Sequence, residues 1–195
     1  MKIGIMGGTF DPIHNGHLLA AETAREQAGL DEVWFMPANV PPHKANAPKA
    51  TAEQRLFMVE EAIASHDAFK AKDIELARGG TSYTTDTVEK LRNQYPDYNF
   101  YYIIGADMVM YLPNWNRIEQ LVSMIGFIGV TRAGYGIDLN SLPEPIRKQV
   151  QLCEMPNMEL SSTDIRERRR HGKDIRYRVP DSVRTYIGEN RLYEA

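Results

Sequence analysis

The chain has 195 residues, of which 43% are hydrophobic and 25% charged, and this composition is typical of a globular domain rather than a disordered chain. Its formal net charge of -3 at pH 7 argues against bulk electrostatic binding to nucleic acid or to an anionic membrane, so any phosphate site must be local. The single Cys153 excludes an intrachain disulfide and a cysteine metal cluster. No secretory segment and no apolar run of about 18 residues occurs, and we expect a soluble, cytoplasmic protein.

Predicted strands and helices alternate along most of the chain. Short apolar runs predict strands over residues 3–6, 33–36, 69–76, 99–104, 125–130 and 151–155. Amphipathic spacing, caps and proline stops predict helices over residues 18–28, 51–64, 84–95, 116–122, 143–149 and 180–189, and one that opens at 161–163. This alternation indicates an α/β fold with a Rossmann-like, doubly wound parallel sheet and helices on both faces. Because no repeat or linker is visible, we expect one domain over residues 1–195, with a helical C-terminal part over 161–195.

Charge, proline and capping patterns predict further local features over residues 37–76. Residues 37–51 contain four prolines that could not sit in a central strand, and the length of this segment indicates a loop that faces a substrate. Thr51 and Gln54 predict a capping box at the start of the next helix. In residues 69–76 lysines and acidic residues alternate with apolar ones, as is typical of an edge strand.

Residues 7–17 form the segment that predicts a binding site most directly. Gly7 and Gly8 follow the first strand and let the backbone approach a ligand, and the helix start beyond them offers N–H groups and a positive dipole end. His14 and His17 flank that helix start, where an imidazole stays neutral until an anion favours its charged form. The segment therefore predicts a phosphate site, the alternative being that one histidine caps the helix and the other packs in the core.

A second candidate site follows residues 99–104, the clearest central strand in the sequence. Gly105 and Asp107 come directly after this strand, and open α/β sheets bind their ligands at the carboxyl ends of the strands. We therefore expect Asp107 to take part in ligand binding.

Two signatures resemble those of the (T/H)-x-G-H nucleotidyltransferase superfamily. The first is Gly7-Gly8-Thr9-Phe10-Asp11-Pro12 with His14-Asn15-Gly16-His17, and the second is Ser161-Ser162-Thr163-Asp164-Ile165-Arg166. Four segments between them resemble the bacterial nicotinate mononucleotide adenylyltransferases, namely residues 41–44, 82–87, 104–108 and 112–115. The similarity spans nearly the whole chain, and it implies an enzyme of NAD biosynthesis that joins nicotinate mononucleotide and ATP to give nicotinate adenine dinucleotide and pyrophosphate.

The resemblance implies a reaction without a protein nucleophile, in which catalysis consists of positioning and charge neutralisation. His14 and His17 would bind phosphate oxygens at the reacting centre, and Lys44 and Arg166 would neutralise phosphates from opposite sides. The residues implied in ATP binding are Gly7, Gly8, Thr9, Phe10, His17, Gly105, Asp107, Ser162, Thr163 and Arg166. Those implied in mononucleotide binding are Thr9, His14, Lys44, Tyr83, Thr85, Trp115 and Arg132. Mg²⁺ would arrive with ATP, and no residue is assigned as a metal ligand.

Some of these residues have a structural alternative. Lys44 would then be a solvated loop lysine, Trp115 a core side chain and Arg132 a cap at a strand end. The seven Lys or Arg residues between positions 166 and 178 are typical of a solvated helix face, and a nucleic-acid patch is the weaker interpretation. This chain departs from many members of the family at two positions. Asn116 stands where they have an aromatic residue, which puts the wall of the pyridine pocket in question. Ala133 stands where they have a proline, which puts the stiffness of the loop after Arg132 in question.

The sequence also bears on rival functions. The same chemistry with nicotinamide mononucleotide or phosphopantetheine is the nearest alternative, and a nucleotide sensor without turnover is the non-enzymatic one. An oxidoreductase is disfavoured because Thr9 stands where the second glycine of G-x-G-x-x-G would be, and a P-loop kinase because the Walker A pattern is missing. Zinc at His14 and His17 would lack a third ligand nearby. The expected partners are ATP and nicotinate mononucleotide, without nucleic acid or membrane; the sequence leaves open whether the chain forms a homo-oligomer.

Overall fold

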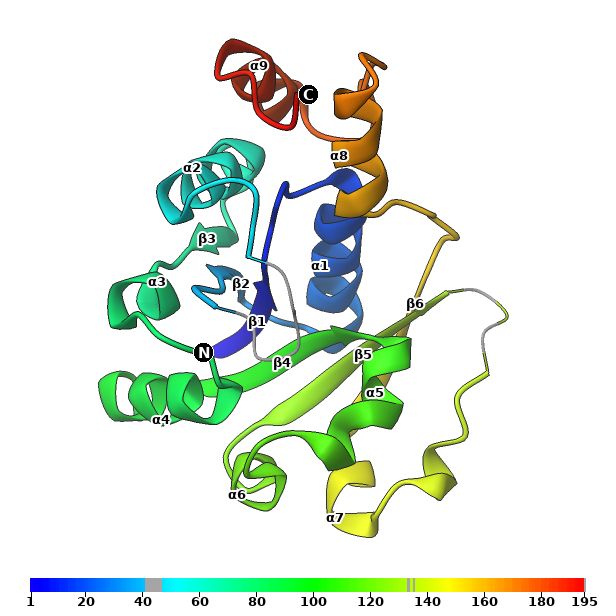
Figure 1. The fold of residues 1–195 in the computed structure, drawn as a ribbon. Helices are drawn as coiled ribbons and strands as arrows, with labels where there is room; N and C mark the ends of the chain where they lie inside the picture. Colours follow the sequence, from blue (N-terminus) through cyan, green and yellow to red (C-terminus); the bar gives the residue numbers. More distant parts are fainter. Residues whose placement is uncertain (41–46, 133, 135, 195) are drawn as a thin grey trace.

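Six parallel strands form the centre of the protein, whose computed structural model describes residues 1–40, 47–132, 134 and 136–194 (Figure 1). The strands are β1 (Lys2–Gly8), β2 (Glu32–Pro37), β3 (Phe69–Ala71), β4 (Asn99–Gly105), β5 (Gly126–Arg132) and β6 (Val150–Met155). Their order is β3-β2-β1-β4-β5-β6, and every neighbouring pair is parallel. The chain builds outward from β1 in one direction and from β4 in the other, so the predicted doubly wound α/β sheet is confirmed.

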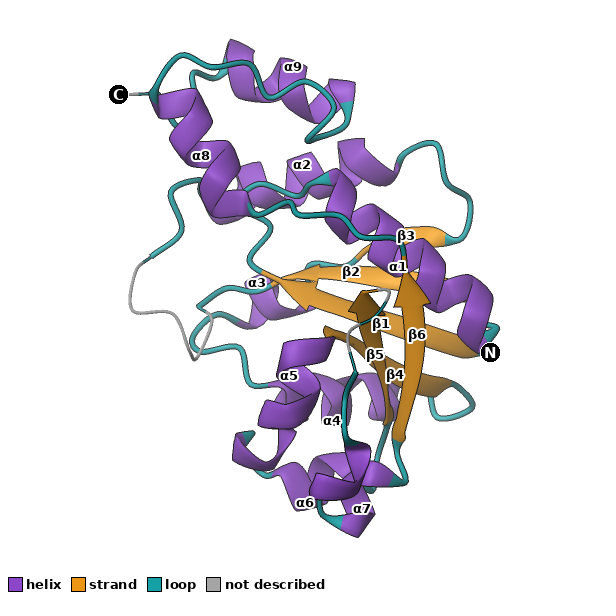
Figure 2. Ribbon diagram, turned by 90° about the vertical axis from the view of Figure 1, so that its right-hand side faces the viewer, coloured by secondary structure: helices purple, strands orange, loops and turns teal. Residues whose placement is uncertain are grey.

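Helices cover both faces of this sheet, as Figure 2 shows. One face carries α1 (Asn15–Ala28), α2 (Ala52–Ile63), α8 (Ser162–Arg170) and α9 (Asp181–Glu189). The other carries α3 (Ile74–Arg78), α4 (Thr84–Gln94), α5 (Ala106–Tyr111), α6 (Ile118–Val122) and α7 (Glu144–Arg147), with short 3-10 turns at Leu112–Asn114 and Leu139–Ser141. Each layer buries its own apolar cluster against the sheet, and removal of this surface from water stabilises the fold.

Side chains of strand β4 alternate between the two apolar clusters. Phe100, Tyr102 and Ile104 belong to the cluster beneath α4 and α5, whereas Ile103 belongs to the cluster beneath α1. The strand is therefore covered on both sides, as its near-continuous apolar sequence predicts.

The local signals at the helix ends are also confirmed. Gly29 ends α1 in the left-handed conformation with φ 62°. At the start of α2 the Thr51 hydroxyl accepts from the Gln54 N–H at 3.2 Å, and the Gln54 side chain accepts from the Thr51 N–H at 2.9 Å.

Two predicted boundaries are wrong and one helix was missed. β3 is the edge strand but ends at Ala71, and residues 74–78 form helix α3, because Ile74 packs on the core and Glu75 is buried there. Helix α5 was not predicted, since six residues give less than two turns of periodicity. Gly7 and Gly8 belong to β1, where they pair with Met36 and Pro37, rather than to the turn.

Two further predictions concern segments near the site. The prediction that the prolines of residues 37–51 lie outside the sheet is wrong for Pro37, which is the last residue of β2 and pairs with Gly8. The prolines at positions 41 and 42 lie outside the described residues, and residues 38–40 and 47–51 form only an isolated bridge, between Val40 and Thr81. Within the described ranges, no helix has the length and apolar character needed to cross a membrane.

Candidate active site

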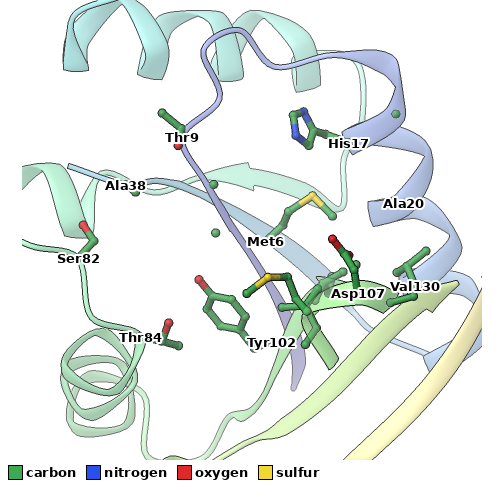
Figure 3. Close-up of a pocket in the computed structure, with 18 of the residues that line it drawn as sticks. Met6, Thr9, His17, Ala20, Ala38, Ser82, Thr84, Tyr102, Asp107 and Val130 are labelled. Atoms are coloured by element: carbon green, nitrogen blue, oxygen red, sulfur yellow. The ribbon is translucent and has the colours of Figure 1, made fainter. Parts of the chain in front are cut away.

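A cavity of about 940 Å³ lies at the carboxyl ends of β1 and β4, the two strands between which the sheet order reverses direction. Residues 7–9 form one part of its wall, and residues 104–108 form another. Such a switch point leaves a crevice between neighbouring strand ends, and ligands of doubly wound sheets bind there. Figure 3 shows its two sides, with His17 and Asp107 on one and Ser82, Thr84 and Tyr102 on the other.

Two glycines keep the backbone of this wall close to neighbouring side chains. A Cβ atom at Gly7 would overlap the hydroxyl of Tyr102, which rises from the neighbouring strand β4. A Cβ atom at Gly105 would lie 2.8 Å from a carboxylate oxygen of Asp107. At Gly7 the contact is far too close unless the buried Tyr102 ring moves, whereas at Gly105 the flexible Asp107 side chain could turn aside.

The two signature histidines lie together at the start of α1. His14 is the N-cap residue and is 6% exposed, and the ring centroids of His14 and His17 are 3.6 Å apart with 18° between the planes. The backbone N–H of His14 donates to Nδ1 of His17 at 3.2 Å, so the neutral His17 ring carries its proton on Nε2. Burial lowers the pKa of His14 to about 4, so this ring is neutral at pH 7. Both histidines line the cavity.

The second signature packs directly on the first. Nη1 of Arg166 donates to the Asp11 carbonyl oxygen at 2.7 Å, and the Ser162 hydroxyl donates to the Pro12 carbonyl oxygen at 2.9 Å. Leu160, two residues before α8, lines the cavity beside Gly16. Helix α8 therefore begins at the cavity edge, where the N–H groups of its first turn have no partner within the helix.

The opposite wall joins the start of α4 to the segment after α5. Tyr83, Trp115 and Asn116 line the cavity here. The Thr85 side chain does not, because it is 1% exposed and its hydroxyl donates to the Asn116 carbonyl oxygen at 2.9 Å. Trp115 lies edge-on to Tyr102, with centroids 5.7 Å apart, and so lines the cavity and packs on the core at once.

The structure brings most of the predicted site residues to one cavity: Gly7, Gly8, Thr9, His14, His17, Tyr83, Gly105, Asp107, Trp115 and Arg132. Phe10 lies behind it instead, 2% exposed and edge-on to His17, because its ring fills the core beneath the turn. Ser162, Thr163 and Arg166 on α8 do not line the cavity; their side chains bond to the first signature or to one another. Lys44 and Ala133 lie outside the described residues.

Sequence reasoning missed four polar residues that support the site. Glu75, on α3, is 3% exposed and accepts from the Thr87 hydroxyl at 2.8 Å, and burial raises the pKa of its carboxyl. Arg55 is 2% exposed and donates to the carbonyl oxygens of Thr9 and Ala38 at 2.8 and 2.7 Å, so it ties the ends of β1 and β2 together. The other two are Tyr102 and Asp11. Asp11 had a signal, since it stands within the first signature, and so had Tyr102, since the alternation along β4 places its side chain on one face of the sheet.

The described residues contain no group of three or more His, Cys, Asp or Glu side chains that could hold a metal ion. Arg132 lines the cavity and is 53% exposed at its side chain, and its Nη1 lies 3.7 Å from Glu159. A cavity with two imidazoles, a helix N-terminus and an exposed guanidinium is suited to bind a polyphosphate.

Residues 5–168 match a family described as cytidylyltransferase-like. A solved structure, the Plasmodium falciparum nicotinic acid mononucleotide adenylyltransferase complexed with NaAD, has the same fold, with a TM-score of 0.79 and 24% sequence identity over 98% of this chain and 97% of that one. The fold and the site thus define the class of protein, a nucleotidyltransferase.

Curated relatives narrow this class. The chain is 47% identical to the nicotinate-nucleotide adenylyltransferase of Bacillus subtilis over 194 residues, which cover 100% of this chain and 99% of the relative. It is 50% identical to a probable nicotinate-nucleotide adenylyltransferase of Oceanobacillus iheyensis over 98% of this chain and 96% of the relative. The chain belongs to the nicotinate-nucleotide adenylyltransferase family.

Proposed function

We propose that this protein transfers the adenylyl group of ATP to nicotinate mononucleotide, as a step of NAD biosynthesis. A phosphate oxygen of the mononucleotide attacks the α-phosphorus of ATP and forms the new P–O bond. The bond from the α-phosphorus to the oxygen bridging to the β-phosphorus breaks, and pyrophosphate leaves with both electrons of that bond. The observation that carries the proposal is the stacked pair His14 and His17, which lines a cavity large enough for two nucleotides. This cavity lies where the strand order of the sheet reverses, in a chain that belongs to the nicotinate-nucleotide adenylyltransferase family.

The two histidines act as hydrogen-bond donors to phosphate oxygens. Because Nδ1 of His17 accepts from the His14 backbone, Nε2 is the nitrogen of this ring that would donate to phosphate. The buried ring of His14 enters the reaction neutral, and phosphate binding stabilises its charged form. In-line transfer places extra charge on the α-phosphate oxygens, and donors fixed before the reaction stabilise that charge without reorganisation.

The two ends of the cavity receive different nucleotides in this proposal. The ATP end comprises residues 7–9, with Gly105 and Asp107 at the ribose and the N–H groups of Ser162 and Thr163 at the triphosphate. Arg166 neutralises the phosphates from α8, and Lys44, which lies outside the described residues, neutralises them from the opposite side. The mononucleotide end comprises Thr9, His14, Lys44, Tyr83, Thr85, Trp115 and Arg132. Since the Thr85 hydroxyl is bonded to Asn116, Thr85 acts through its backbone and by holding that segment.

The enzyme class acts on ATP, generally with a divalent metal ion, and we propose Mg²⁺ here. The carboxylates on the cavity wall among the described residues are Glu75 and Asp107, and that of Glu75 already accepts from Thr87. This donor set fits an ion held mainly by phosphate oxygens and water. When bound, the ion would neutralise charge on the phosphates that leave. Cytoplasmic location and the absence of nucleic-acid or membrane partners stay predictions from the sequence.

Pyrophosphate release with different acceptors tests this function. Purified protein with Mg-ATP is supplied with nicotinate mononucleotide, nicotinamide mononucleotide or phosphopantetheine, each over a range of concentrations. We expect kcat/KM for nicotinate mononucleotide to exceed that of either rival by at least about tenfold, because a site built around a substrate's polar groups rejects analogues that leave them unpaired. Faster turnover of a rival contradicts the substrate assignment, and binding of ATP without pyrophosphate release from any acceptor indicates a sensor.

A further inference from the structure

Asp11 has a buried carboxylate that the proposed reaction does not use. The residue is 4% exposed, and three donors converge on its side chain. The backbone N–H groups of Lys49 and Ala50 donate to its two oxygens at 2.8 and 3.0 Å, and the hydroxyl of Tyr193 donates to Oδ1 at 2.8 Å. These donors come from residues that are 38, 39 and 182 positions away in the sequence.

The Asp11 backbone is fixed as firmly as its side chain. Its carbonyl oxygen accepts from Arg166, and the next carbonyl oxygen, that of Pro12, accepts from Ser162. Two residues further on, the N–H of His14 bonds to the ring of His17. Because hydrogen bonds fix the backbone between Asp11 and His14, a displacement of Asp11 would also move the two histidines.

Tyr193 follows helix α9, and its side chain reaches back to the first signature at Asp11. Its φ of 64° is in the left-handed region, which costs a residue with a side chain free energy. The N–H of the preceding Leu192 bonds to the Ile187 carbonyl oxygen at 3.0 Å, so α9 presents Tyr193 to Asp11. Burial and the Asp11 charge raise the pKa of Tyr193, so the hydroxyl keeps the proton that it donates.

We propose that Tyr193 is a positioning residue for adenylyl transfer: together with the N–H groups of Lys49 and Ala50 its hydroxyl fixes the Asp11 carboxylate, and thereby the orientation of His14 and His17 towards bound phosphates. The proposal rests on the proposed function for its kinetic effect. The proposal gives a kinetic role to the segment after α9, although none of the described residues of this segment lines the cavity. A purely stabilising contact would leave the folded enzyme's turnover unchanged.

The test compares two tyrosine-to-phenylalanine variants of the full chain. Tyr193→Phe removes the hydroxyl that reaches Asp11, whereas Tyr186→Phe removes one from α9, where the ring packs on Phe57 with centroids 4.4 Å apart. We expect Tyr193→Phe to lower kcat about tenfold while KM for both substrates changes by less than about twofold, because small misplacement of reacting groups lowers turnover more than binding. Tyr186→Phe should leave both constants unchanged. Each variant is assayed well below its own melting temperature.

A second measurement is independent of activity. The imidazole signals of His17 are followed by NMR in the nucleotide-free protein, and we expect them to shift in Tyr193→Phe but not in Tyr186→Phe. A folded Tyr193→Phe with the wild-type kcat, or with unshifted His17 signals, overturns the proposal. If Tyr193→Phe does not fold, Asp11→Asn provides the same two readouts with the same expected directions. If the wild-type protein releases no pyrophosphate, the proposed function has failed, and the His17 signals still decide whether Tyr193 positions the histidines.

Discussion

The rings of His14 and His17 stack with centroids 3.6 Å apart, and the backbone N–H of His14 holds Nδ1 of His17 at 3.2 Å. The stacking and the hydrogen bond together fix the position of one ring and the tautomer of the other. A bound phosphate would thus meet donors that are already oriented, and preorganised donors lower the barrier most effectively where charge develops.

Replacement of His17 should impair turnover more than binding. We expect His17→Ala to lower kcat by at least about 100-fold, because it removes a donor that acts on the transition state, with a loss of ATP affinity of about threefold or less. Steady-state kinetics and calorimetric titration with ATP measure the two quantities. His171→Ala, at the exposed C-terminal end of α8, is the control. Unchanged turnover in His17→Ala would refute the role of this residue.

His14 should make folding stability depend on pH. Burial lowers its pKa from 6.5 to about 4, so the unfolded chain binds a proton in this interval that the folded protein does not. The contribution of His14 is complete above pH 6.5 and is lost as the pH falls towards 4, by about 3 kcal/mol in the free energy of unfolding. Urea unfolding at several pH values measures the slope. We expect His14→Asn to reduce the dependence of the free energy of unfolding on pH, and His171→Ala to leave this dependence unchanged. Equal slopes in His14→Asn and the wild type would contradict the lowered pKa of His14.

Gly7 should not tolerate even one added carbon. In Gly7→Ala the new methyl group overlaps the Tyr102 hydroxyl, and overpacking of this kind costs about 1–3 kcal/mol. Chemical denaturation measures the loss, and Gly188→Ala is the matched control, since its Cβ would meet no described atom within 4 Å on helix α9. That control should be neutral or stabilising by up to about 1 kcal/mol. Equal stabilities of the two variants would mean that Tyr102 can turn away without cost.

Loss of the Thr85 hydroxyl should affect one substrate only. Thr85→Val leaves the Asn116 carbonyl oxygen without its donor, and we expect KM for nicotinate mononucleotide to rise about five- to tenfold because the segment with Trp115 is no longer held. KM for ATP should stay within about twofold, since the ATP end has its own contacts. The control is Thr185→Val, at an exposed position of α9. A parallel rise of both KM values would contradict the division of the cavity into two ends.

Sequence patterns predicted the order of strands and helices and the cavity-lining residues of the first signature, because those features depend on local periodicity and on short motifs. The turn from β3 into α3 was missed because Glu75 and Lys72 look like the polar face of a strand, and only the tertiary fold buries Glu75. The bond from Tyr193 to Asp11 joins residues 182 positions apart, and nothing in either neighbourhood signals it. Thr85 was predicted to face the ligand, but its side chain is bonded within the wall.

The most direct test follows the phosphates of ATP. Protein, Mg²⁺ and nicotinate mononucleotide are incubated with ATP labelled either at the α-phosphate or at the γ-phosphate, and the products are separated. Adenylyl transfer at the cavity of His14 and His17 predicts the α-label in the dinucleotide and the γ-label in pyrophosphate. A γ-label in the mononucleotide product, or an α-label that stays with a released adenosine phosphate, would contradict it.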